Sequence, residues 1–188
     1  MFRRFMTPDR PQDAPVAEPP APAGSAAETA TARQIVARLD AMPADEARYL
    51  ACFAYVMSRA AHADLKISDE ETAIMNRFAV EYGGLDEAQA VLVIGMTKIQ
   101  ATIEGATEDY VVTREFRKIS SPEQRLQLLR CCFAIGATDG TINAEEAAVV
   151  NEIARELDVE RADLNRVRDE FHEQLSSVQA LRKAGGGA

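Results

Sequence analysis

Several common sequence signals are missing from this chain of 188 residues. No apolar run reaches about 18 residues, so we expect no membrane-spanning helix. The first residues, MFRRFM, are basic but lead into no apolar stretch, so we expect no secretory signal. The three cysteines, Cys52, Cys131 and Cys132, are odd in number and lack Cys-x-x-Cys spacing, which argues against disulfides and that type of metal or redox motif. All three lie in apolar helical patterns, so we expect small buried hydrophobic residues there.

A recognisable set of catalytic residues is also missing from the sequence. The chain has only two histidines, which leaves little room for a nucleophilic triad, and neither a P-loop nor a Gly-x-Gly-x-x-Gly motif occurs. Asp169 and His172 have the spacing of one half of a di-iron motif, but such a site needs a second pair and two further glutamates. We therefore expect His172 to be an exposed polar residue and the protein to be no enzyme.

The charge balance is acidic, with a formal net charge of −9. An acidic chain repels phosphate backbones, so we expect no nucleic-acid partner. We expect a protein partner, whose identity the sequence does not give. We expect a cytoplasmic protein. Its first segment, with Phe2, Phe5 and two arginines, could touch the inner face of the membrane, but this segment is too short to anchor the protein alone. We interpret a set of glutamates as a solvated face: Glu123, Glu152, Glu156 and Glu173.

Proline and glycine divide the chain into three parts. Residues 1–30 hold six of the eight prolines and are predicted to be a disordered arm. Residues 31–180 carry helical signals throughout and are predicted to form the folded domain. The chain is 47% hydrophobic, which is enough to fill a core. Residues 181–188, which end in AGGGA, are predicted to be a flexible tail.

Helix-start signals predict an all-α bundle of seven to eight helices. The first is expected over about 31–41, the second begins at Pro43, a shorter one follows Thr107, and an amphipathic last helix covers about 160–178. Four capping patterns mark further starts: Ser68 with Glu71, Asp86 with Gln89, Ser121 with Gln124, and Asn143 with Glu146. The stretches around Leu50–Ala60 and Leu126–Ile135 are apolar on nearly all sides, so we place them at the centre of the bundle.

Two segments after these central helices repeat each other at an offset of 75 residues. Residues 63–82 read ADLKISDEETAIMNRFAVEY and residues 138–157 read TDGTINAEEAAVVNEIAREL. Eight of the twenty positions are identical, where chance would give about one or two, so we interpret the pair as a duplication. The fold is therefore expected to contain two related helix–turn–helix halves about a pseudo-twofold axis.

The repeated turn follows an Asp-x-x-Ile-x-x-Glu-Glu pattern, beginning at Asp64 and at Asp139. The aspartate opens the turn, the isoleucine plugs it into the core, and the glutamates fall where the dipole of the next helix favours negative charge. These paired acidic turns resemble the TerB (tellurite resistance) family and the N-terminal region of DjlA-type co-chaperones, over about residues 45–175. The resemblance implies an all-helical bundle, suspected divalent-metal binding, and an association with tellurite resistance, stress and membrane-linked complexes.

Two interpretations of the acidic turns stay open. If the pseudo-twofold axis brings them together, Asp64, Glu71, Asp139 and Glu146 could share a hard cation such as Ca²⁺, Mg²⁺ or Mn²⁺. His62 would shift the preference toward Zn²⁺, and Glu70 and Glu145 are weaker candidate ligands. The alternative is that these carboxylates only cap helices. An EF-hand is rejected, because its first ligand positions would fall on Ile135 and Ala137.

The sequence thus predicts a non-enzymatic, TerB-like stress or tellurite-resistance module that binds a divalent metal. The alternative function is a metal-free adaptor of the co-chaperone type, in which exposed helix faces bind a partner protein and the proline-rich arm is a tether.

Overall fold

A computed structural model describes residues 26–61, 69–101 and 109–185 of the chain. Over these residues the chain is helical, as the sequence predicts, and its one β-bridge joins Ile142 to Leu175. The elements are α1 (Ala26–Asp40), α2 (Ala44–Ala60), α3 (Asp69–Glu81), α4 (Glu87–Ala101), α5 (Asp109–Ile119), α6 (Pro122–Gly136), α7 (Ala144–Glu156), α8 (Arg161–Glu170), the 3₁₀ helix η1 (His172–Gln174) and α9 (Ser176–Gly185).

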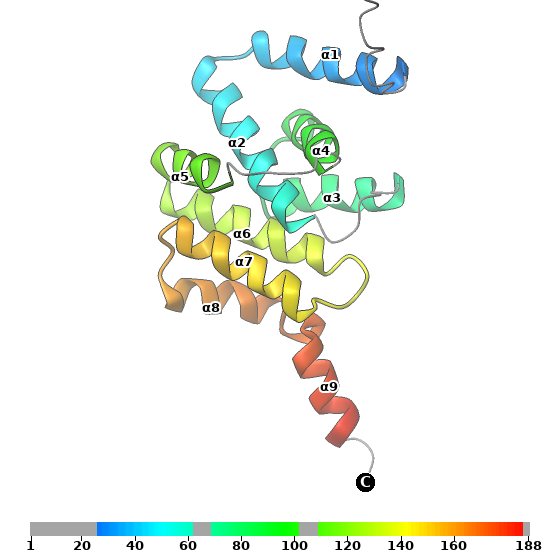
Figure 1. Cartoon of the computed structure of the whole chain (residues 1–188), viewed down its shortest axis with the longest axis vertical. Coiled ribbons are helices and arrows are strands. Elements are labelled where there is room, and N and C mark those ends of the chain that lie inside the picture. Colours follow the sequence, from blue (N-terminus) through cyan, green and yellow to red (C-terminus); the bar gives the residue numbers. More distant parts are fainter. Residues whose placement is uncertain (1–25, 62–68, 102–108, 186–188) are drawn as a thin grey trace, which may run out of the picture.

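Helices α2 and α6 form the centre of the bundle, which confirms the prediction from their apolar circumference. α2 packs against α4, α5, α6 and α7, and α6 packs against α3, α7 and α8. Their largest side chains, including Phe53, Leu50, Leu129 and Phe133, are fully buried. Figure 1 shows α1 lying across one end of this body and α9 projecting from the other.

The duplication seen in the sequence is also present in the helices. Both ends of α7 lie 75 residues after the corresponding ends of α3. The packing crosses between the halves, because α3 contacts α6 and α7 contacts α2. Each half therefore covers the central helix of the other, as two hairpins do when neither can bury its apolar face alone.

Side-chain caps begin the helices where the sequence predicts them. Asp86 Oδ1 accepts from the Gln89 amide at 2.8 Å and Gln89 Oε1 accepts from the Asp86 amide at 3.1 Å, ahead of α4. Ser121 with Gln124 and Asn143 with Glu146 form the same reciprocal box ahead of α6 and α7. The predicted capping box at Ser68 and the predicted cap at Thr107 lie outside the described residues.

The prediction of one continuous last helix is wrong. α8 ends before Phe171, and η1 and an extended Leu175 separate it from α9. The Ile142 amide donates to the Gln174 carbonyl at 2.7 Å, and the Ser176 amide donates to the Ile142 carbonyl at 2.9 Å. These two hydrogen bonds hold residues 174–176 against the acidic turn, and that pairing replaces the helical hydrogen bonds there.

Helical structure also extends beyond two predicted boundaries. α1 begins at Ala26, inside the predicted arm, and α9 continues to Gly185, inside the predicted tail. The break at Phe171 divides one predicted helix into two, so the described residues form nine α-helices, where the sequence predicts seven to eight. None of the helices in these described ranges is long and apolar enough to cross a membrane.

The three cysteines are buried, as predicted. Burial raises the pKa of Cys132 to about 12, raises the pKa of Cys131 well above its ordinary value, and raises the pKa of Cys52. Since the thiolate is the reactive form, we expect all three to react with a disulfide reagent at pH 8 at least about a hundredfold more slowly in the folded chain than in urea. Absorbance of the released thiolate measures both rates. Equal rates in the two states would contradict the buried placement.

Candidate functional site

The predicted metal ligands come from two turns, of which the structure describes the second. His62 and Asp64 lie outside the described residues. Glu70 and Glu71 belong to the first turn of α3, and their side chains also lie outside that description. Asp139, Glu145 and Glu146 are described, in the connection from α6 to α7 and the first turn of α7. Whether the two turns meet therefore stays a prediction.

The second acidic turn is built from short-range hydrogen bonds. Thr138 donates through its hydroxyl to the Ile135 carbonyl at 2.8 Å, which closes the end of α6. Gly140 follows with a φ of +87°, a conformation that glycine adopts without steric cost. Asp139 Oδ1 then accepts from the Thr141 amide at 2.9 Å, and Ile142 enters the core with 1% of its surface exposed. The aspartate opens the turn and the isoleucine enters the core, as the Asp-x-x-Ile pattern predicts.

Glu146 both caps its helix and faces the end of α6. Its Oε2 atom accepts from the Asn143 amide at 2.8 Å, while Asn143 Oδ1 accepts from the amides of Glu145 and Glu146. The carboxylate also lies 3.8 Å from the position that a Cβ atom on Gly136 would take, so it rests against the last turn of α6. Glu146 is half-buried, whereas Asp139 and Glu145 are exposed.

Helix α9 braces this turn from outside the repeated unit. Gln179 Nε2 donates to the Gly140 carbonyl at 2.9 Å, and Gln179 Oε1 accepts from the Thr141 hydroxyl at 3.0 Å. The hydrogen bonds of Ile142 to Gln174 and Ser176 lie alongside. The backbone that presents Asp139 is thus held by residues 174–179, which reduces the entropy lost when a ligand binds.

The chemistry of the second turn suits a hard cation in part. The described hydrogen bonds use one oxygen of Asp139 and one of Glu146, and each carboxylate keeps a second oxygen. The C-terminal end of α6 adds a negative partial charge beside them, and the N-terminal end of α7 adds a positive one. Within the described ranges, however, no three His, Cys, Asp or Glu side chains gather into a metal-binding group. The second turn alone therefore supplies too few ligands for a metal site.

A buried ion pair that sequence patterns do not predict links three helices. Arg59 on α2 donates to Glu156 on α7 at 2.6 Å and to the Thr113 hydroxyl on α5 at 2.7 Å. The side chains of Arg59 and Glu156 are only 9% and 6% exposed. The interpretation of Glu156 as part of a solvated glutamate face is wrong, because tertiary packing of α7 on α2 covers it. The only signal in the sequence is that glutamate occupies this position in both repeats, at Glu81 and Glu156.

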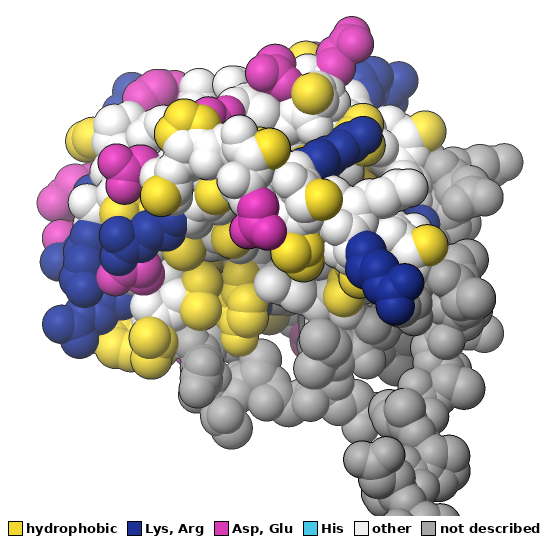
Figure 2. Space-filling view, turned by 90° about the horizontal axis from the view of Figure 1, so that it is seen from above, with side chains coloured by type: hydrophobic (Ala, Val, Ile, Leu, Met, Phe, Trp, Pro, Cys, Tyr) yellow, Lys and Arg dark blue, Asp and Glu magenta, His cyan; other side chains and the backbone are white. Residues whose placement is uncertain are grey.

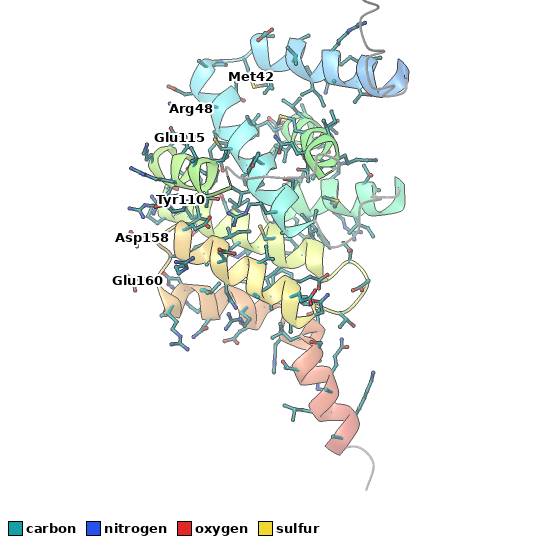
Figure 3. All side chains as sticks on the ribbon, viewed as in Figure 1. Met42, Arg48, Tyr110, Glu115, Asp158 and Glu160 are labelled. Carbon is teal, nitrogen blue, oxygen red and sulfur yellow. The ribbon has the colours of Figure 1, made fainter. Side chains whose placement is uncertain are left out.

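A groove of about 700 Å³ lies where the end of α1 and the beginnings of α2 and α4 meet. Figure 2 views the molecule from the end that carries α1, where hydrophobic side chains lie among acidic and basic ones. Met42, at the junction of α1 and α2 in Figure 3, is one lining residue. The others are Arg38, Ala41, Glu46, Asp86, Glu87, Ala88, Gln89, Val91 and Leu92.

The fold and its turn define a class: a duplicated all-helical bundle in which an acidic, helix-capping turn connects the central helix to the next one. The model of the family described as tellurite resistance protein TerB matches residues 49–169. That range begins within α2 and ends within α8, so it includes both repeats. The chain belongs to the TerB family. No curated protein and no solved structure matches it.

Proposed function

We propose that this chain is a non-enzymatic TerB-family module that binds a divalent cation through its two acidic turns, within a stress or tellurite-resistance system. The observation that carries the proposal is the braced second turn, where Asp139 and Glu146 each keep one oxygen beyond the hydrogen bonds described for them.

The ligand chemistry favours a hard ion. Carboxylate oxygens suit Ca²⁺, Mg²⁺ or Mn²⁺, and Ca²⁺ takes about six to eight oxygen ligands. Asp139 and Glu146 supply two of these, so Asp64 and Glu71 of the first turn, or water, would supply the others. His62 as a ligand would favour Zn²⁺. The cation would fix the two turns relative to each other and so control the surface that the bundle presents to a partner.

Isosteric substitution tests this proposal without disturbing the turn. Asp139→Asn and Glu146→Gln remove both charges but keep the oxygens that accept from the Thr141 and Asn143 amides. At a metal concentration a hundredfold above Kd, we expect the wild-type chain to gain about 2.7 kcal/mol of stability and the double variant to gain much less. Thermal unfolding and titration calorimetry with Ca²⁺, Mg²⁺, Mn²⁺ and Zn²⁺ measure this.

Glu152→Gln is the matched control, since it removes one carboxylate charge from an exposed position of α7. We expect this variant to respond to the metal as the wild-type chain does. If the wild-type chain releases no heat and shows no thermal shift at millimolar concentrations of all four ions, cation binding is rejected.

A second candidate is a metal-free adaptor of the co-chaperone type. It is favoured by α5, where Tyr110 and Val111 are 57% and 63% exposed beside each other (Figure 3 labels Tyr110). If this face binds the partner, Tyr110→Ser with Val111→Ser abolishes partner binding, while the Asp139→Asn, Glu146→Gln variant retains it. Loss of partner binding only in the carboxylate variant would favour the cation-dependent function.

A further inference from the structure

The groove between α1, α2 and α4 combines an apolar floor with an acidic rim. Met42, Val91 and Leu92 supply apolar surface, and Val91 is 53% exposed although it lies on a helix of the core. Glu46, Asp86 and Glu87 supply the acidic rim, against one basic lining residue. Asp86 and Glu46 accept hydrogen bonds from Gln89, which fixes them at the wall. Such a groove fits a short segment with both aromatic and basic side chains.

The chain carries a segment of this chemistry at residues 2–6, which read FRRFM. We propose that residues 2–6 dock in this groove of the same molecule. The two arginines match the acidic rim, and the phenylalanines and the methionine match the apolar floor. The remainder of the arm, residues 7–25, connects the segment to the beginning of α1.

The length of the arm suits this docking. α1 has 15 residues and is therefore about 22 Å long, and the groove lies at its far end from the arm. Residues 7–25 span about 24 Å as a flexible coil, and about 60 Å if their prolines extend them. A linker whose mean span matches the distance gives an effective concentration in the millimolar range. Even a weak contact, with a Kd of about 1 mM, would then be occupied for much of the time.

The groove is separate from the part of the fold that defines the family. Arg38, Met42 and Glu46 precede residue 49, where the family match begins. The arm and one wall of its docking site thus both precede the residues that match the TerB family. The groove lies at the end of the body that carries α1, and α9 projects from the other end (Figure 1). Docking is therefore independent of cation binding.

Paramagnetic broadening in the full-length chain tests the docking. Thr7→Cys introduces a thiol for a nitroxide label, since the three native thiols are buried. We expect the amide signals of residues 87–91 on α4 to broaden, and those of residues 165–169 on α8, at the other end of the body, to stay sharp. Arg3→Glu with Arg4→Glu should lower the ratio of docked to undocked arm by about tenfold and abolish the broadening.

A reversal of charge on the groove tests whether the arginines contact the acidic rim specifically. Glu87→Lys in the Arg3→Glu, Arg4→Glu background should restore part of the broadening, because the repulsive pair becomes attractive again. Broadening that is uniform over α4 and α8, or that survives the Arg3→Glu, Arg4→Glu change, overturns the proposal. Binding to lipid would also overturn it. In that case the chain would bind vesicles of equal parts phosphatidylcholine and phosphatidylglycerol, this binding would require Arg3 and Arg4, and the signals of α4 would show no broadening.

Discussion

Replacing Arg59 with methionine is expected to lower the free energy of unfolding by about 3–5 kcal/mol. The substitution leaves the Glu156 carboxylate, whose side chain is 6% exposed, without the guanidinium that neutralises it. It also removes the donor to the Thr113 hydroxyl, so α2, α5 and α7 lose their shared polar contact. Urea denaturation of the wild-type and variant chains, followed by circular dichroism, measures the difference.

Two controls separate buried charge from loss of packing. The double substitution Arg59→Met, Glu156→Leu should recover most of the lost stability, because it removes both charges and keeps apolar volume. Arg155→Met removes a partner of Glu152 from an exposed pair and should leave the stability unchanged within error. A double variant no more stable than Arg59→Met would show that the stability depends on something other than the unneutralised charge.

Phe133→Ala is expected to cost about 3–5 kcal/mol, because it opens a large cavity in the central helix. The ring is fully buried, and it stacks on Phe171 with centroids 5.7 Å apart. Phe171 lies at the point where α8 ends, so the cavity also loosens the segment that pairs with Ile142. We expect amide exchange of Ile142 and Ser176 to accelerate by more than that of Gln89, which lies near the beginning of α4, a helix that packs on α1, α2 and α3.

Phe133→Leu is the conservative control and should cost less than the alanine variant, because it keeps much of the buried volume. The global cost comes from chemical denaturation, and the local effect comes from hydrogen exchange at individual amides. If Ile142, Ser176 and Gln89 all accelerate equally, the ring supports the fold as a whole, and the specific connection to the acidic turn through Phe171 is contradicted.

The sequence predicts those features that depend on local chemistry. The caps at Asp86, Ser121 and Asn143 follow from one short-range pair of side chain and amide each, and all three are present. The burial of α2 and α6 follows from apolar residues on all sides of the helix. The second acidic turn likewise follows from its own residues, since Asp139 accepts from an amide two positions later.

Features that depend on distant partners are the ones the sequence does not predict. Glu156 has the composition of a solvated helix face, yet Arg59, 97 positions away, makes it a buried ion-pair residue. The apolar spacing of residues 160–178 continues through Phe171 without interruption, but the helix does not. The groove at Met42 joins residues from three helices, and no single stretch of sequence signals it.

By itself, the sequence determined an all-α, duplicated chain of the TerB type, with its two buried helices and the carboxylates of its acidic turns. Helix propensity, capping and apolar periodicity act between residues a few positions apart, so they can be followed directly along the chain. Only the tertiary structure decided which carboxylate is buried, where the last helix breaks, and how α9 braces the turn at Gly140. Those outcomes arise because a distant hydrogen bond or charge, once packing excludes water from it, outweighs the local preference of the segment.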